Sequence, residues 1–322
     1  MGGRFRAGPS EDYPATLVEF ERRFTSEASC RDYLARVRWP QGFRCPRCGS
    51  ERSGPTGREG LWQCAACRHQ TSVLAGTIFE GTRLPLQLWF RAMWFVTSQK
   101  NGASALNMQR QLGLNRYETV WTMLHKLRRA MVRPDRERLS GRVEVDESFV
   151  GGVEKGVRGR ATETKALVVI GAEEDGRGIG RIRLQTVPDA SAPSLISFVQ
   201  ENVAVGSVVH TDGWEGYRDL ATKGYRHEVT NIKGSGKLGH EVLPRVHRVA
   251  SLLKRWLLGT HQGAVAHLHL DYYLDEFAFR FNRRTSKARG KLFYRLAQQA
   301  VEVEPVSWRD VADAERGHHH KI

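Results

Sequence analysis

Apolar residues recur every three or four positions through much of the first 133 residues, which is the spacing of amphipathic helices. Between residues 13 and 37 this spacing breaks near Ser26 and therefore predicts two short helices. A third helix is predicted over residues 85–101. A fourth is predicted over residues 104–113 and a fifth over residues 115–131, so this part of the chain is expected to be largely helical.

The last three of these helices follow the pattern of a helix-turn-helix domain. A helix is followed by a short helix, a turn that contains Gly113, and a basic third helix. The third helix would then read a DNA groove, with Asn115 and Arg116 near its exposed start as DNA-binding residues. An ordinary helical bundle that links two domains would show the same pattern.

After Pro134 the pattern changes from helices to strands. Residues 143–150 alternate between apolar and polar, residues 166–172 form a continuous apolar run, and residues 180–187 alternate again. A helix predicted over residues 191–203 leads to a fourth strand over residues 207–212. Three strands, a crossover helix and a fourth strand are the order of ribonuclease-H-like domains, so we expect an α/β core with a mixed sheet and flanking helices.

Two pairs of cysteines precede the helix-turn-helix segment. Cys45 and Cys48 form one CxxC pair, and fifteen residues later Cys64 and Cys67 form another. Each pair can supply two sulfurs to a tetrahedral Zn²⁺ ion, so the spacing predicts a structural zinc ribbon. Two disulfides or a redox CxxC are the alternatives. Cys30 leaves the cysteine count odd and no secretory signal peptide is visible, and both observations favour zinc in a reducing compartment.

Composition adds a strong positive charge. The chain of 322 residues carries 50 Lys and Arg against 35 Asp and Glu, a net charge of +15, and most of the excess lies in the first 140 residues. This half is expected to bind a polyanion, although arginine-rich coding in a GC-rich genome would also raise the charge. Hydrophobic residues make up 40% of the chain, and no run approaches the roughly 20 apolar residues of a membrane span.

These patterns divide the chain into five parts. We expect a basic helical segment at 1–38, a zinc ribbon at 39–80, a helix-turn-helix domain at 84–133, a ribonuclease-H-like catalytic domain at 140–300 and a tail at 301–322.

Two aspartates of the predicted sheet carry the candidate chemistry. Asp146 lies within the first strand and Asp212 ends the fourth. The first and fourth strands are neighbours in a sheet of this order, so both carboxylates can meet one divalent cation. Their hard oxygen atoms suit Mg²⁺ or Mn²⁺, and two such ions can promote an in-line displacement at phosphorus.

Four long motifs resemble the DDE-type transposases of bacterial insertion sequences, specifically the zinc-ribbon group, which is insertion-sequence family fifteen ninety-five. The motifs are residues 143–152 (VEVDESFVGG), 210–217 (HTDGWEGY), 257–263 (LLGTHQG) and 276–284 (EFAFRFNRR). The cysteine pairs and the segment 89–100 match the same group. The resemblance implies a catalytic core that cuts DNA and joins DNA ends, in the cytoplasm of a bacterium at the nucleoid.

The resemblance also implies a third metal-site residue, which is Glu, Asn or His in that family, with a Lys seven residues later. His247 and Lys254 have this spacing, which is two turns of a helix, so both project from one face. An imidazole at this position suits Mn²⁺ better than Mg²⁺. Glu276 is the rival third ligand, unless it is an ion-paired helix residue that contacts Arg280.

A basic run near the end of the predicted catalytic domain is a second candidate DNA contact. Arg280, Arg283 and Arg284 could bind phosphate, or could form an ordinary solvated face.

Together these features predict a transposase that binds double-stranded DNA at the ends of an insertion sequence. We expect it to cleave DNA and transfer strands as a homodimer or a higher synaptic complex. A catalytically silent DNA-binding regulator and a ribonuclease-H-like nuclease without strand transfer are the alternatives.

Overall fold

The structure is a computed structural model, and it describes residues 11–58, 60–133, 136–152, 165–231, 236, 238–263 and 265–312. The described residues form two compact units. The first contains the residues up to Arg133 together with the segment from Thr285 onward, and the second contains the described residues between them, up to Arg284.

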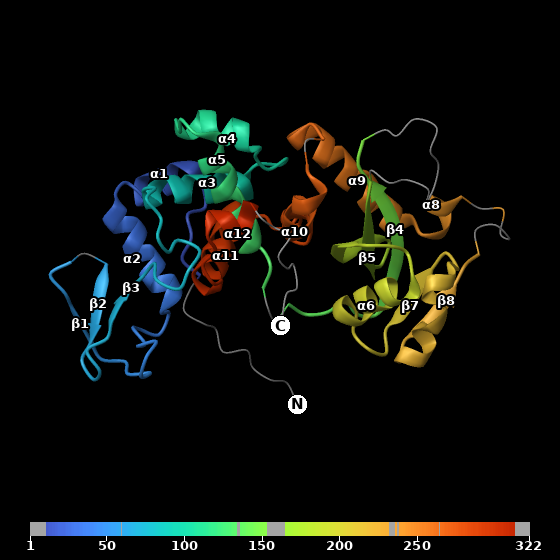
Figure 1. The fold of residues 1–322 in the computed structure, drawn as a ribbon, viewed down its shortest axis with the longest axis horizontal. Coiled ribbons are helices and arrows are strands. Elements are labelled where there is room, and N and C mark those ends of the chain that lie inside the picture. The colour runs from blue at the N-terminus through green and yellow to red at the C-terminus, as the bar shows by residue number, and fades with distance from the viewer. Residues whose placement is uncertain are drawn as a thin grey trace. The chain divides into compact units, whose positions relative to one another are not determined.

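Most of the first unit is helical, and α1 to α5 lie where the apolar spacing predicts helices, whereas α11 and α12 were not predicted. Thr16 and Ser26 cap α1 and α2 through side-chain hydrogen bonds, and Ser104 caps α4, which ends at Gly113 in the left-handed conformation. The helices are α1 (Leu17–Arg23), α2 (Glu27–Arg38), α3 (Leu86–Ser98), α4 (Ala105–Leu112), α5 (Tyr117–Arg129), α11 (Arg289–Glu302) and α12 (Trp308–Ala312) (Figure 1).

An aromatic cluster forms the core of this helical unit. The ring of Phe293 on α11 lies 5.5 Å from Phe20, 5.6 Å from Phe90 and 5.9 Å from Tyr33, measured between ring centroids. Phe293 is fully buried. The helix α11 therefore packs with α2 and α3. The sequence pattern places residues 285–300 in the catalytic domain, whereas the structure groups them with the first unit, because the apolar face of α11 completes this cluster.

A small sheet of three antiparallel strands lies between α2 and α3 in the chain. Its strands are β1 (Ser53–Pro55), β2 (Leu61–Cys64) and β3 (Gln70–Ser72), with β2 in the middle. Trp62 on β2 lies 5.3 Å from Trp39, and Trp39 lies 5.2 Å from Phe43. These rings supply the ribbon with the few apolar contacts that so short a sheet can make.

The second unit is organised around a five-stranded sheet in the order β6-β5-β4-β7-β8. β4, β5 and β6 are antiparallel neighbours, whereas β7 and β8 run parallel to β4. This is the ribonuclease-H-like arrangement that the order of predicted strands indicated. The strands are β4 (Arg142–Val150), β5 (Ala166–Asp175), β6 (Gly178–Val187), β7 (Val208–Thr211) and β8 (Arg226–Val229).

Helices cover both faces of this sheet. One face packs against α6 (Ala192–Asn202) and the 3₁₀ segment η2 (Glu215–Lys223). The other face packs against α9 (Pro244–His261) and α10 (Leu270–Phe281). The short elements α8 (Gly239–Val242) and η3 (His267–His269) precede α9 and α10. Both faces of the central strands are therefore removed from water.

Side chains of α10 also hydrogen-bond the edge strand β6. Asp271 accepts a hydrogen bond from the backbone N–H of Thr186 at 2.9 Å, and Asn282, just after α10, accepts one from the N–H of Ile182 at 2.8 Å. These bonds satisfy edge groups that would otherwise be open to another strand.

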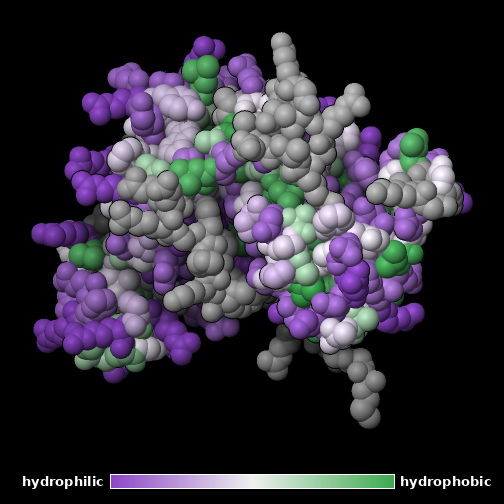
Figure 2. All heavy atoms as spheres, turned by 45° about the vertical axis from the view of Figure 1, so that its right-hand side comes forward, coloured by the Kyte–Doolittle hydropathy of each residue, from purple (hydrophilic) through white to green (hydrophobic). Residues whose placement is uncertain are grey.

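The face drawn in Figure 2 carries mostly hydrophilic described side chains, and its hydrophobic side chains form small scattered groups. Scattered apolar residues of this kind are ordinary on a protein surface. Among the described helices, none is both long enough and apolar enough to span a membrane.

Candidate active site and zinc centre

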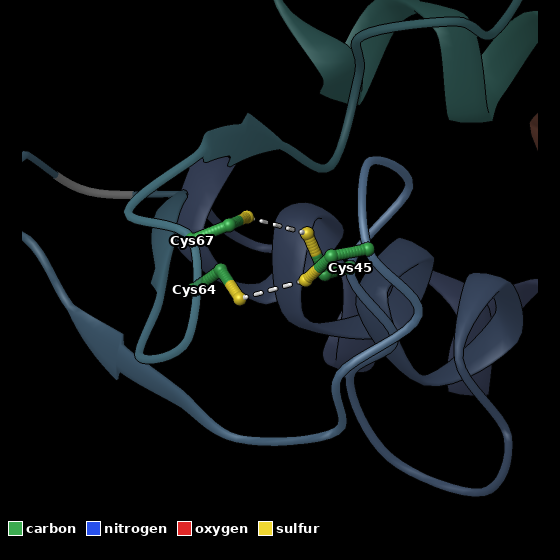
Figure 3. A group of neighbouring side chains, drawn as sticks. Cys45, Cys64 and Cys67 are labelled. Atoms are coloured by element: carbon green, nitrogen blue, oxygen red, sulfur yellow. Dashed lines mark hydrogen bonds between the residues drawn. The ribbon is translucent and has the colours of Figure 1, made fainter.

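The four cysteines of the two CxxC pairs converge on one point (Figure 3). The sulfur atoms of Cys45 and Cys67 are 3.6 Å apart, as are those of Cys48 and Cys64. All four sulfur atoms lie within 4.8 Å of one another. A tetrahedral ion with Zn–S bonds of about 2.3 Å requires sulfur atoms about 3.8 Å apart, so the four thiolates fit Zn²⁺.

Both cysteine pairs lie in turns of the same form. The N–H of Gly49 donates to the carbonyl of Cys45 at 2.9 Å, and the N–H of Arg68 donates to the carbonyl of Cys64 at 3.0 Å. Gly49 and Arg68 both have positive φ, at 71° and 59°. The backbone N–H of Cys67 lowers the pKa of the Cys64 thiol to about 6, against the opposing effect of burial. Against a hydrogen bond from the backbone of Ser50, hydrogen bonds with the other three cysteines raise the pKa of the Cys48 thiol to about 12, so the four thiols share their protons unequally. The convergence of the four sulfur atoms is what fits a structural zinc ion.

Asp146 and Asp212 lie on neighbouring strands at matching positions. β4 and β7 are parallel, and Glu144 on β4 pairs with His210 on β7. Asp146 lies two residues beyond Glu144, and Asp212 lies two residues beyond His210, so both aspartates belong to the same face of the sheet. Backbone N–H groups hold each carboxylate: Glu147 donates to Asp146 at 2.8 Å and Trp214 donates to Asp212 at 3.0 Å.

His247 approaches these aspartates from α9. Its Nε2 atom lies 3.5 Å from Oδ2 of Asp146. Burial lowers the pKa of His247, and His240 lowers it further, whereas Glu144 and Asp212 oppose the shift. The imidazole is therefore neutral at neutral pH, which leaves a nitrogen lone pair for a metal ion. Two carboxylates and a neutral imidazole are a donor set that fits Mn²⁺, and also Mg²⁺.

The three donors are arranged more openly than the four cysteines. Among the described residues, only the cysteines form a group of three or more ligands whose donor atoms all lie within 4.8 Å. Lys254, two turns beyond His247 on α9, is exposed. The face that carries both residues is thus accessible to a large substrate.

The structure places Glu276 away from this group, in an ion pair with Arg280 at 3.3 Å. Glu276 is 1% exposed and lies on α10, which packs on β6, at the opposite side of β4 from β7. Its position agrees with the interpretation of Glu276 as an ion-paired helix residue.

The basic run after Glu276 is engaged in contacts within the second unit. The guanidinium of Arg283 lies 4.0 Å from the ring centroid of Phe279, and that of Arg284 lies 4.1 Å from the ring centroid of Phe281. Arg284 also donates to the carbonyl of Ile179. With Arg280 bound to Glu276, all three arginines have structural partners, and of the three only Arg284 is exposed.

At the start of α5, Asn115 and Arg116 are exposed. Further along α5, Thr122 and Lys126 line a pocket of about 500 Å³ together with Trp308 of α12. Arg116 also lines this pocket, so the pocket extends to the start of α5.

Tyr217 is a core residue on the face of the sheet that α6 and η2 cover, and the charges of the site reach it. It belongs to η2 and is fully buried. Burial raises the pKa of its hydroxyl, and Glu147, Asp146 and Asp212 raise it further. In the sequence, only its place in the motif 210–217 could have indicated that Tyr217 lies near the two aspartates. A tyrosine at helical spacing is otherwise expected to be an ordinary core residue.

Comparison with known proteins agrees with this architecture. Residues 138–282 match the family described as the ISXO2-like transposase domain, and residues 25–70 match the transposase zinc-ribbon domain. An uncharacterised protein in transposable element ISH50 of Halobacterium salinarum is 28% identical over 290 residues, which cover 84% of this chain and 95% of that protein.

Two solved structures of the Mos1 transposase are weakly similar. A paired-end complex with the left transposon end has a TM-score of 0.29 and 13% identity, over 70% of this chain and 79% of that one. A pre-cleavage Mos1 transpososome has a TM-score of 0.27 and 12% identity, over 71% and 79%. The family assignment rests on the two matched domains and their order: the chain belongs to the zinc-ribbon insertion-sequence transposases with an ISXO2-like DDE domain.

Proposed function

We propose that this transposase binds the ends of an insertion sequence, cleaves the DNA there and transfers the freed strand into target DNA. The observation that carries the proposal is the placement of Asp146 and Asp212 at matching positions on parallel neighbouring strands, with His247 3.5 Å from Asp146. This arrangement supports Asp146, Asp212 and His247 as the ligands of the catalytic divalent ions.

In this proposal, each residue of the site has a separate role in the reaction. Divalent ions bound here would supply Lewis-acid activation of the attacking oxygen and stabilisation of the leaving oxygen. Asp146 and Asp212 would hold them with carboxylates that the N–H groups of Glu147 and Trp214 keep in one orientation. Lys254 would bind a phosphate of the element end. Water would first cut the phosphodiester, and the resulting 3′-hydroxyl would then attack target DNA, so no covalent bond to the protein is required.

The DNA partner is double-stranded DNA, at the element ends and at the target. Asn115 and Arg116 would contact the element end, because they lie exposed at the start of α5. The contacts found for Arg280, Arg283 and Arg284 make them weaker candidates. Because two ends must be brought together, we propose that the working form is a homodimer or a higher synaptic complex.

The test is strand transfer of a labelled element end with Mg²⁺ or Mn²⁺. Asp146→Asn, Asp212→Asn and His247→Ala should each lose joined product, whereas Asp219→Asn, which changes an exposed carboxylate of η2, should keep it. Cut DNA without joined product would indicate a nuclease. DNA binding without cleavage by the wild type would indicate a silent regulator. If Glu276→Gln abolished joining and His247→Ala did not, the third ligand would be Glu276.

A further inference from the structure

A buried carboxylate holds the beginning of α9. Glu144 is 1% exposed and lies two residues before Asp146, on the same face of β4. One of its oxygens accepts hydrogen bonds from the backbone N–H of Arg245 at 2.7 Å and of Val246 at 3.0 Å. The other oxygen accepts one from the Arg245 guanidinium at 2.8 Å.

These bonds replace a local helix cap. The N-cap residue of α9 is Leu243, whose side chain makes no capping hydrogen bond, and Pro244 follows it in the first turn. Proline has no N–H, so the next two N–H groups are the ones that need an acceptor. Glu144 supplies this acceptor from a strand that lies about a hundred residues earlier in the chain, and its charge is favourable at a helix N-terminus.

Arg245 fastens the same end of α9 to the neighbouring hairpin. Its guanidinium donates to the carbonyls of Gly176 at 2.8 Å and Gly178 at 3.0 Å, in the turn between β5 and β6. It also contacts Glu174 at 3.1 Å. The first turn of α9 is therefore fixed to three strands of the sheet, β4 through Glu144, β5 through Glu174 and β6 through Gly178.

His247 follows directly after the two anchored residues. The position of its ring beside Asp146 depends on where this turn of α9 is held. We infer that Glu144 is a positioning residue that acts through His247, by holding the start of α9 so that the imidazole faces Asp146. This inference rests on the proposed role of His247 as the third metal ligand.

The contacts of Glu144 could also belong to a buried salt bridge that only stabilises the fold. The chain contains a second buried carboxylate that serves as a matched control for this alternative. Glu173 on β5 is 8% exposed, accepts hydrogen bonds from the N–H groups of Ser140 and Arg181, and pairs with the Arg181 guanidinium at 2.6 Å. Among the bonds described for it, none goes to α9. Glu144→Gln and Glu173→Gln therefore remove equivalent charges, but only the first loosens the start of α9.

The experiment measures Mn²⁺ affinity of the full-length, zinc-loaded protein, by electron paramagnetic resonance of the unbound ion. Removing an outer-shell partner of a ligand typically weakens metal binding about 10–100-fold. We expect this loss for Glu144→Gln, and a change of less than about 3-fold for Glu173→Gln even though its melting temperature falls. If Glu144→Gln does not fold, Glu144→Asp keeps the buried charge and should show a smaller loss in the same direction.

A double variant distinguishes the possible failures. If Glu144 acts through His247, Glu144→Gln should not weaken Mn²⁺ binding further once His247→Ala is present. Equal affinities for Glu144→Gln and Glu173→Gln, with a clear loss for His247→Ala, would overturn this inference alone. An unchanged affinity for His247→Ala would overturn both this inference and the assignment of the third ligand.

Discussion

At the scale of single residues, Glu173 shows how a buried carboxylate is kept charged. Burial alone would raise its pKa, but hydrogen bonds from the Arg181 guanidinium and from the N–H groups of Ser140 and Arg181 outweigh this effect, and its pKa lies below 4.5. The carboxylate therefore contributes stability above pH 4.5, and this contribution is lost as the pH falls through the lower pKa of the folded state.

Glu173→Gln should reduce the free energy of unfolding by about 1–3 kcal/mol at pH 7, because it removes the charged partner of Arg181 and leaves this guanidinium only its exposed contacts with Glu137 and the carbonyl of Arg138. The difference from the wild type should shrink as the pH falls below 4.5, because the wild-type carboxyl then becomes protonated. Urea unfolding at pH 7, 5 and 3.5 measures both effects. A difference that stays constant over this range would contradict the assigned pKa shift.

Single residues also show the limit of what the sequence could predict. The spacing of the cysteines predicted the zinc ligands, because both pairs act within a short stretch of chain. Glu144 alternates with two valines, as an exposed position of a half-buried strand would, and its partners on α9 are about a hundred residues away. Such long-range hydrogen bonds leave no local pattern, so the anchor could not be predicted.

At the scale of elements, the contact between α10 and the edge strand β6 can be tested. Asn282 accepts from the N–H of Ile182 at 2.8 Å and donates to its carbonyl at 3.1 Å. Asn282→Ala should cost about 1–3 kcal/mol, because it leaves edge groups unsatisfied, and should increase aggregation on heating. Gln200→Ala, at an exposed position of α6, is the control. If light scattering rises equally in both variants on heating, the contact between Asn282 and β6 does not protect the edge strand from aggregation.

The zinc ribbon allows a second test at this scale. Removing zinc should unfold β1, β2 and β3, because a site of this kind supplies about 10–16 kcal/mol to folding. A thiol reagent should then modify four cysteines in the metal-free protein and none in the zinc-loaded protein. Cys30 should stay unmodified in both, because burial raises the pKa of its thiol to about 12. Mass spectrometry gives the number of modified cysteines. Modification of Cys30 under native conditions would contradict the prediction that this thiol stays protected.

Elements with a strong apolar period were predictable, and weakly patterned ones were not. The predicted strand at 143–150 corresponds to β4 (Arg142–Val150), because Val143 and Val145 occupy alternate positions that are buried in the core on one face of the sheet. The residues of β8 (Arg226–Val229) show no alternation of apolar and polar positions that would predict a strand. This strand is short and largely exposed at the edge of the sheet, so it has no buried face to produce an alternation.

At the scale of the whole molecule, the two units differ in how the chain builds them. Residues 134–284 are continuous and contain both clusters that cover the sheet, so this fragment should fold alone. A fragment of residues 1–133 lacks Phe293 and the rest of α11. Within the full chain, Phe293→Ala should destabilise the first unit by about 3–5 kcal/mol.

Thermal unfolding followed by circular dichroism tests this difference. We expect a cooperative transition for the fragment 134–284 and none for the fragment 1–133, with recovery when a peptide of residues 285–312 is added. A cooperative transition of the fragment 1–133 by itself would show that α11 is dispensable. The predicted boundary at residue 300 missed this division, because the amphipathic pattern of α11 indicates a buried face and does not indicate which core buries it.

The late position of α11 sets an order of events during protein synthesis. The ribosome completes the sheet and its covering helices before it reaches Phe293, whereas the aromatic cluster of the first unit must wait for that residue. The amino-terminal helices are made first and are fully packed last. A nascent chain therefore acquires its ribonuclease-H-like core before the unit that carries α5, and a chain interrupted before residue 289 has the five-stranded sheet with Asp146 and Asp212 without a finished helical unit.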